Sequence, residues 1–312
     1  MLNTAQKLYD SFGVKEMGKV KKDTSTIFHI DSIKVLNMTP EFHEIGYDNI
    51  KQNLVKTTKR VEPAAEVRED KVAIVGYGPS LKETWKMVAN YDVIITMSGA
   101  HDFLIQRGIM PTYHIDCDPR PHKAEFTKNA KKEVKYLMAS SCHPDAIDQL
   151  MDYDLTLWNL ETTKECPLPE GERFFPGMGC IGLQSLLIAR HVLGYRNMVL
   201  FGMDCSFKDN KTHASYHPRS QEQGDRIRIG IGEYAKEKTA KDYKIFSTSV
   251  MLVVYAKEMY LWMSTVLNDC QFEVVGDGLL PAYLMYEVEK ANKLWQQTES
   301  QEKAATMSNE KV

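Results

Sequence analysis

The sequence lacks the spacings and apolar runs that mark several common classes of protein. Its six cysteines are scattered, without the CxxC or CxxH spacing of zinc sites, so we expect small buried thiols in a reducing compartment rather than metal ligands or disulfides. No stretch approaches the roughly 18 apolar residues of a membrane span. Residues 1–20 also lack the apolar core of a signal peptide. We therefore expect a cytoplasmic protein that makes no membrane contact.

An excess of charge of one sign is absent as well. The 312 residues include 39 Lys and Arg against 42 Asp and Glu, which gives a formal net charge of −3. Proteins that bind nucleic acids or anionic membranes usually carry a basic excess, so neither is an expected partner. With 43% hydrophobic residues, a chain of this length can bury a full core.

Short apolar runs alternate with helical segments from residue 71 onward. Runs such as KVAIVGY (71–77) and NMVLFGMD (197–204) are continuously apolar, which is typical of parallel strands covered on both faces. We therefore expect an α/β fold: a Rossmann-like, doubly wound, mostly parallel sheet with helices on both faces. Residues 66–295 would form this domain, after a small N-terminal extension (1–65) and before a polar, disordered tail (296–312). Ligands of such sheets bind at the carboxyl ends of the strands.

The first of these strands ends in the turn GYGPSL. Gly76 and Gly78 permit positive φ angles and close backbone approach. Pro79 stiffens the turn, and Ser80 opens an S-x-x-E capping box at the start of a helix. Free amides at a helix start bind phosphate or carboxylate groups, so this turn is a candidate for binding nucleotide phosphates. The alternative is an ordinary tight turn with a helix cap.

Two familiar phosphate motifs are missing at this turn. Leu81 occupies the third glycine position of the dinucleotide fingerprint. The second strand ends in TMSG, with no acidic residue for a ribose hydroxyl, and Asp102 follows only on the next helix. The GK[ST] of a Walker motif is absent too. NAD enzymes and P-loop kinases are therefore disfavoured.

Polar residues gather where the strand PTYHIDCD ends. Strand alternation places His114, Asp116 and Asp118 on one side. Carboxylates at the end of a parallel strand suit a metal–nucleotide site or a contact to a substrate hydroxyl. The alternative is a solvated strand end with a salt bridge to Arg120.

Two further glycine turns are expected at the same edge of the sheet. Gly177 and Gly179 precede a long apolar helix, and Gly276 and Asp277 follow the last strand. Such turns contact nucleotides through backbone groups, or simply allow a helix to pack closely on a strand. We assign both turns to nucleotide binding.

The strand NMVLFGMD ends at Asp204, and the loop after it contains two histidines. A histidine titrates near neutrality and can act as a general base on an acceptor hydroxyl, whereas many loop histidines are only surface residues. The loop, residues 206–244, is long and charged and contains glycines, as lids over active sites do. Asp204, His213 and His217 are the candidate catalytic residues.

In this order the motifs resemble a known superfamily. The runs IVGYGPSL (74–81), HIDCDP (114–119) and GMGCIGLQSLLIARHVLGYRNMVLFGMD (177–204), with the histidine-containing loop, look like the MptE-like family. That family includes archaeal 6-hydroxymethylpterin pyrophosphokinases and flagellin-modifying motility accessory factors. The same frame is similar to bacterial CMP-sialic-acid-dependent sialyltransferases, which carry a G-x-G-P-S-L turn. The resemblance covers about residues 70–290.

The resemblance implies a Rossmann-like transferase with nucleotide phosphates over residues 76–80 and 177–182. In the sialyltransferases a histidine of the lid is the general base, which here means His213 or His217. Where those enzymes place an asparagine after the second strand, this chain has Ser98. We assign Ser98 to nucleotide binding, and the difference argues against CMP-sialate itself as the donor.

The pyrophosphokinase branch of the resemblance implies a different chemistry. There, magnesium and ATP are expected, with Asp116, Asp118 or Asp204 as candidate metal ligands. No other cofactor is implied, and no metal site is assigned from the residues themselves.

These observations favour a glycosyltransferase-like enzyme that transfers a sugar from a nucleotide-sugar donor to an acceptor hydroxyl. The sialyltransferase resemblance implies an inverting single displacement. The alternatives are an ATP-dependent diphosphotransferase acting on a hydroxymethyl group, and a non-catalytic nucleotide-binding module. The donor sugar stays open, and so does the acceptor, whether a protein, a glycan, a small alcohol or a modified base.

Overall fold

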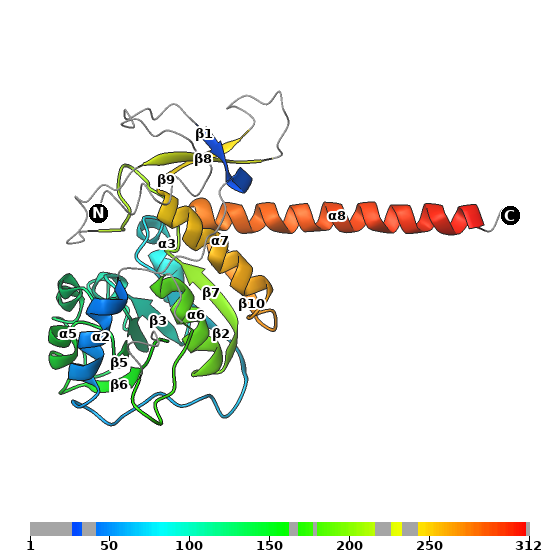
Figure 1. Ribbon diagram of the computed structural model, residues 1–312. Coiled ribbons are helices and arrows are strands. Elements are labelled where there is room, and N and C mark those ends of the chain that lie inside the picture. The colour runs from blue at the N-terminus through cyan, green and yellow to red at the C-terminus, as the bar shows by residue number, and fades with distance from the viewer. Residues whose placement is uncertain are drawn as a thin grey trace.

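The computed structural model describes residues 27–32, 42–161, 168–176, 180–215, 226–232 and 243–309. Within these residues, seven strands form one all-parallel sheet in the order β10-β7-β2-β3-β4-β5-β6 (Figure 1). In chain order the strands are β2 (Arg68–Val75), β3 (Ile94–Met97), β4 (Tyr113–Asp116), β5 (Lys135–Ala139), β6 (Asp154–Trp158), β7 (Tyr195–Phe201) and β10 (Gln271–Val275).

Helices cover both faces of this sheet. Alternate residues of β2 face opposite ways: Val72 and Ile74 pack in one apolar core, and Ala73 and Val75 in another. The first core includes residues of α6 (Ile181–His191) and α7 (Val250–Ser264), and the second includes residues of α3 (Leu81–Val88) and α4 (Ala100–Ile105). The shorter elements η2 (Pro121–Phe126) and α5 (Pro144–Asp148) complete the crossovers. The predicted Rossmann-like fold, doubly wound and covered on both faces, is confirmed.

The direction of winding changes at β2. From β2 the chain adds β3, β4, β5 and β6 on one side, and it then returns through α6 to place β7 and β10 on the other side. The loops after β2 and β7 therefore leave toward opposite faces of the sheet. Such a switch point is where doubly wound sheets bind their ligands. The candidate site is accordingly sought at the carboxyl end of β2.

Helix α2 (Phe42–Asn53) is anchored on the carboxyl edge of this sheet, although it belongs to the predicted extension. The side chain of Asn53 is fully buried, and it donates to the carbonyls of Ser140 (2.9 Å) and Cys142 (2.7 Å). One turn earlier, Asn49 donates to the carbonyl of Ser141 at 3.0 Å. These bonds satisfy carbonyls in the turn after β5 that would otherwise be buried without partners.

A second sheet of three strands occurs among the described residues. It consists of β1 (Ile27–His29), β8 (Ile227–Ile231) and β9 (Lys244–Thr248), and the 3-10 turn η1 (Ile30–Ser32) follows β1. Strands β1 and β8 are parallel, and β8 and β9 are antiparallel. The sequence predicted a long loop over residues 206–244. In the structure, β8 lies within this segment and β9 begins at its last residue. The alternating isoleucines of β8 are the strand signal in this segment.

The chain ends in a long helix, α8 (Leu279–Asn309), which projects from the body of the molecule (Figure 1). Among the side chains of this helix that the structure describes, the buried ones lie in its first turns and include Leu279, Leu280 and Tyr283. The sequence predicted a disordered tail from residue 296, whereas the helix continues to Asn309. The segment is rich in Gln, Glu, Lys and Ala, which have high helix propensity, so polarity alone was a poor guide. None of the helices in the described part of the chain has the length and apolar character needed to span a bilayer.

Candidate functional site

Three turns interlock at the switch point, after β2, β7 and β10. Gly76 donates from its amide to the carbonyl of Phe201 at 2.8 Å, and Gly78 donates to the carbonyl of Gly202 at 2.7 Å. A β-carbon on Gly76 would lie 2.6 Å from the Gly202 carbonyl oxygen, and one on Gly276 would lie 2.7 Å from Ser80 Oγ. The glycines are therefore required for close backbone packing. The structure brings together the predicted residues Gly76, Gly78, Pro79, Ser80, Asp204, Gly276 and Asp277.

The Asp204 carboxylate lies at the start of α3, where the sequence predicted a phosphate. Its Oδ2 accepts a hydrogen bond from the Ser80 amide at 3.1 Å, and a β-carbon on Gly78 would collide with this oxygen. Asp204 is 4% exposed. Burial raises its pKa, against the lowering effect of its bonds to Ser80. A phosphate at this turn would have to compete with Asp204 for the Ser80 amide, and nucleotide binding by these residues remains a prediction.

The predicted capping box at Ser80 does not form. Ser80 already has helical φ and ψ angles, and its side chain makes no capping bond. Asp204 supplies the acceptor at this helix start instead, from the turn after β7. Glu83 points outward to Lys208, whose ammonium also bonds to Asp277 at 3.1 Å. The predicted nucleotide contact Asp277 is thus in a surface ion pair.

A second cluster surrounds Lys123 at the carboxyl ends of β3 and β4. The Lys123 ammonium donates to Ser98 Oγ and to Asp116 Oδ2 (2.9 Å), and it lies 3.9 Å from Asp118 Oδ2. Lys123 is only 6% exposed. Burial by itself would lower its pKa, but Asp116 and Asp118 outweigh that effect and raise it, so the group stays cationic. Ser98 is held with a positive φ of 50° in this cluster.

The salt bridge to Arg120, which was the alternative to a ligand contact at this strand end, is present, with Arg120 Nε donating to Asp118 Oδ1 at 2.8 Å. Burial would raise the Asp118 pKa, but Arg120 and Lys123 hold it below its ordinary value. The remaining oxygen of Asp116, Oδ1, accepts from the amides of Cys117 and Asp118. Both carboxylates are therefore already neutralised by protein groups.

This arrangement does not fit the magnesium ion that the pyrophosphokinase resemblance implied. Asp116 and Asp118 are bonded to Lys123 and Arg120, and Asp204 lies in the other cluster, bonded to Ser80. In the part of the chain that the structure describes, no three His, Cys, Asp or Glu side chains converge as metal ligands would. Magnesium would need these ion pairs to open first.

His213 lies beside the Lys123 cluster. Its Nδ1 is 2.8 Å from Thr212 Oγ1, and its ring centroid is 5.6 Å from that of Tyr77. The next residue, Ala214, donates to the Tyr77 carbonyl at 2.9 Å, which fixes this loop against the turn after β2. Burial, and then the charge of Lys123, lower the pKa of His213 to about 4. The ring is therefore neutral at pH 7. The other predicted residues, His217, Gly177 and Gly179, lie outside the described residues.

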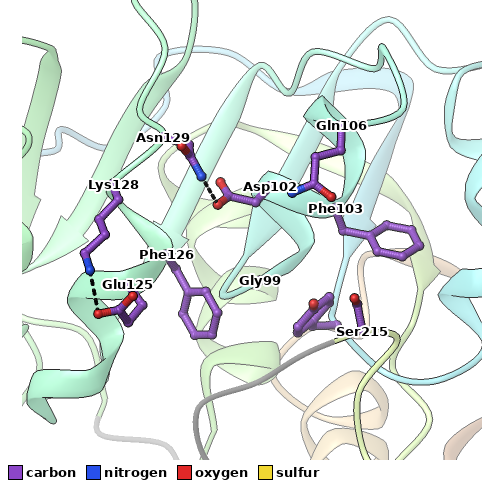
Figure 2. Close-up of a pocket in the computed structure, with 10 residues that line it drawn as sticks. Gly99, Asp102, Phe103, Gln106, Glu125, Phe126, Lys128, Asn129 and Ser215 are labelled. Carbon is purple, nitrogen blue, oxygen red and sulfur yellow. Dashed lines mark hydrogen bonds and ion pairs between the residues drawn. The ribbon is translucent and has the colours of Figure 1, made fainter.

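An open pocket of about 330 Å³ adjoins these residues. Figure 2 shows Phe103 of α4 and Phe126 of η2 on opposite sides of it, with Asp102 between them in this view. Tyr77 and Ser215 also line the pocket, so it extends to the loop that carries His213. The Lys123 cluster and His213 adjoin this pocket through Phe126 and Tyr77, which line it, and we treat the three together as the candidate site.

Lys123 and Asp102 are two residues of this site that were not predicted. Lys123 follows the Asp116–Asp118 pair by a few residues, within the polar stretch PRPHKAEFTK (119–128), and nothing in that stretch distinguishes it from its charged neighbours. The sequence analysis noted Asp102 only because it comes too late in the chain to be the acidic ribose ligand at the end of the second strand. Its position in the first turn of α4, after the tight turn at Gly99, is what brings it into the pocket.

Comparisons with known proteins give one family match and several structures of similar fold. A family model described as 6-hydroxymethylpterin diphosphokinase MptE-like matches residues 46–210. Among solved structures, the MAf glycosyltransferase from Magnetospirillum magneticum AMB-1 is similar, with a TM-score of 0.53 and 14% identity over 76% of this chain. The chain spans only 37% of that protein. A mammalian sialyltransferase aligns with a TM-score of 0.41 and 13% identity, over 80% of this chain and 91% of that one.

At 14% identity the MAf structure establishes the fold alone, and a search of curated protein sequences returned no match. The family match is of a different kind, because it covers more than half of the chain and includes the interlocked turns after β2 and β7 together with the Lys123 cluster. On that evidence, this chain belongs to the MptE-like family.

Proposed function

We propose that the chain is a transferase that binds a nucleotide sugar at the carboxyl edge of β2–β4 and transfers the sugar to an acceptor hydroxyl. The observation that supports this most directly is the pairing of a neutral His213 with a buried, cationic Lys123 beside an open pocket. A neutral imidazole can accept a proton, and a fixed ammonium stabilises negative charge on a leaving phosphate.

The proposed reaction is a single displacement. The acceptor oxygen forms a bond to the anomeric carbon, and the bond from that carbon to the phosphate oxygen breaks. The phosphate keeps the electron pair, near Lys123, and His213 takes the acceptor proton. Asp116 and Ser98 serve to position Lys123, because they hold its ammonium at the strand ends.

Nucleotide binding would also prepare the base. A pKa of about 4 makes His213 a weak base in the free protein. A phosphate close to Lys123 would offset the positive charge that contributes to this low value, and it would favour the imidazolium form. The pKa of His213 would then rise, although burial, the larger cause of its low value, would persist.

The structural neighbour supports the same class, since the MAf protein is described as a glycosyltransferase. That description concerns a protein of which this chain covers 37%, so donor and acceptor are part of the proposal. The family description supports a second candidate, a diphosphokinase. In that reaction a hydroxymethyl oxygen would attack the β-phosphorus of ATP, and AMP would leave with the electron pair.

A nucleotide panel separates these functions. The protein is incubated with CMP-, UDP- and GDP-sugars, and with ATP plus magnesium, while its melting temperature and the released nucleotide are measured. A sugar transferase should be stabilised by a nucleotide sugar and should slowly hydrolyse it. A diphosphokinase should instead release AMP when given 6-hydroxymethylpterin, and a binding module should be stabilised without turnover.

The role of His213 is tested in the same assay. His213→Ala should lower donor hydrolysis by about 100-fold or more, as loss of a general base does, while the melting shift with the donor persists. His143→Ala, at the surface start of α5, is the matched control and should keep full hydrolysis. If no nucleotide raises the melting temperature, or if His213→Ala is fully active, the proposal fails.

A further inference from the structure

The pocket contains the carboxylate of Asp102, which two side-chain donors orient from behind. Asp102 Oδ1 lies 2.7 Å from His101 Nδ1, and Asp102 Oδ2 accepts from Asn129 Nδ2 at 2.6 Å. The Asp102 side chain is 19% exposed, whereas that of His101 is fully buried. Figure 2 shows the bond from Asn129 to Asp102 at the edge of the pocket.

A hydrogen-bond chain lies behind Asp102. A carboxylate can only accept, so Nδ1 of His101 carries a proton. Nε2 of His101 lies 3.1 Å from the hydroxyl of Tyr136, and the Tyr136 oxygen accepts from the Lys131 amide at 2.7 Å. Every member of this chain has a partner, which fixes the plane of the carboxylate.

The Asp102 carboxylate retains acceptor capacity after these bonds, and its side chain lines the pocket. A carboxylate has about four acceptor positions, of which His101 and Asn129 use two. Among the described residues, no Lys or Arg side chain forms an ion pair with Asp102, and Lys128 at the rim is paired with Glu125 at 2.7 Å. The pocket thus presents two neighbouring acceptors, and a suitable ligand has two neighbouring donors.

The walls around these acceptors suit a flat ring. Phe103 and Phe126 line two sides, and Gly99 and Tyr77 also line the pocket. A β-carbon on Gly99 would lie 2.6 Å from Tyr77 Cδ1, so the ring packs directly on bare backbone. Aromatic rings are the surfaces on which heteroaromatic rings stack.

We propose that this pocket binds the base of the nucleotide, and that Asp102 selects a ring with the 2-amino-4-oxopyrimidine edge, as guanine has. This edge places an N–H and an amino group side by side, which matches both acceptors of Asp102. Uracil offers one N–H between two carbonyls, which the carboxylate repels, and cytosine and adenine offer one amino group beside a ring acceptor. The inference rests on the proposed function, since it names the donor base. Pterins carry the same edge.

The test compares GMP, AMP, CMP and UMP by calorimetric titration of the full chain. GMP should bind at least about tenfold more tightly than the others, because one bidentate contact discriminates bases to that degree. Asp102→Asn converts one acceptor into a donor. This variant should therefore lose affinity for GMP and prefer XMP, whose 2-oxo group replaces the amino group. Asp148→Asn, a surface change of the same chemistry on α5, should leave the ranking unchanged.

The outcomes separate this inference from the proposed function. If CMP- or UDP-sugars are the donors and Asp102→Asn is indifferent to the base, the assignment of Asp102 is overturned while the transferase stands. If GMP binds through Asp102 but no GDP-sugar is turned over, the transferase fails while the base pocket stands. Binding of 6-hydroxymethylpterin that is lost in Asp102→Asn supports the same edge recognition. The wild-type ranking needs no variant, so it decides the matter even if Asp102→Asn does not fold.

Discussion

Replacing His213 with glutamine should remove a large part of the loss of stability that the protein shows in mild acid. Burial and the neighbouring Lys123 hold the pKa of His213 at about 4 in the folded state, against about 6.5 in an unfolded chain. As the pH falls, the imidazole of His213 is protonated in the unfolded chain before it is protonated in the folded protein. The contribution of the neutral ring is therefore complete above about pH 6.5 and is lost progressively as the pH falls toward 4.

The size of the effect follows from the difference between the two pKa values. In full it amounts to about 3 kcal/mol, and between pH 7.5 and pH 5 it amounts to about 2 kcal/mol. His114 is fully buried, and burial lowers its pKa as well, so it weakens the fold in the same pH range. Because His114 is present in both proteins, the difference between wild type and His213→Gln isolates His213.

The measurement is urea unfolding of the wild type and His213→Gln at pH 7.5 and pH 5. Wild type should lose about 2 kcal/mol more than the variant over this interval. Ser215→Ala alters the same loop without removing a titrating group, and it should show the wild-type pH dependence. Equal losses for wild type and His213→Gln would refute the assignment of a neutral, buried His213.

Two further predictions concern the clusters at the strand ends. Lys123→Met should destabilise the fold by about 3–5 kcal/mol in urea unfolding at pH 7, because Asp116 is then buried without its partner, and the double variant with Asp116→Asn should recover part of this loss. A result in which Lys123→Met alone is neutral would mean that the pair is not buried in solution. Gly276→Ala should cost more than Gly108→Ala in melting experiments. Both glycines have positive φ angles, but a β-carbon at Gly276 would meet Ser80 Oγ at 2.7 Å, whereas at Gly108 nothing lies within 4 Å. If both substitutions destabilised the protein equally, each by the ~1 kcal/mol that a positive φ angle costs an alanine, the turns after β2 and β10 would be less tightly packed than described.

The main sheet could be predicted from the sequence because its strands are buried on both faces. Val72–Val75 and Ile94–Met97 are continuously buried, and such runs carry a strong signal whatever lies around them. The convergence of the turns at Gly76, Asp204 and Gly276 was also predictable, since all three follow parallel strands that end at one edge.

The parts that could not be predicted depend on contacts between distant segments. Strand β1 is three residues long, and it exists through its pairing with β8 far along the chain. Asp204 displaces the local capping box at Ser80 because a buried carboxylate from another loop is the better acceptor. Lys123 becomes a site residue only when η2 folds it back onto Asp116, a geometry that spacing alone does not reveal.

The docking of α2 has a consequence for which positions of the sequence can vary among relatives. Asn49 and Asn53 bond to main-chain carbonyls, including those of Ser140 and Cys142, and not to the side chains of those residues. Every amino acid carries that carbonyl, so these bonds do not restrict which side chains the turn after β5 presents. The two asparagines have no such freedom, because a side-chain amide at that length is needed to reach the carbonyls. Relatives of this chain should therefore vary more readily in the turn than at the two helix positions that hold it.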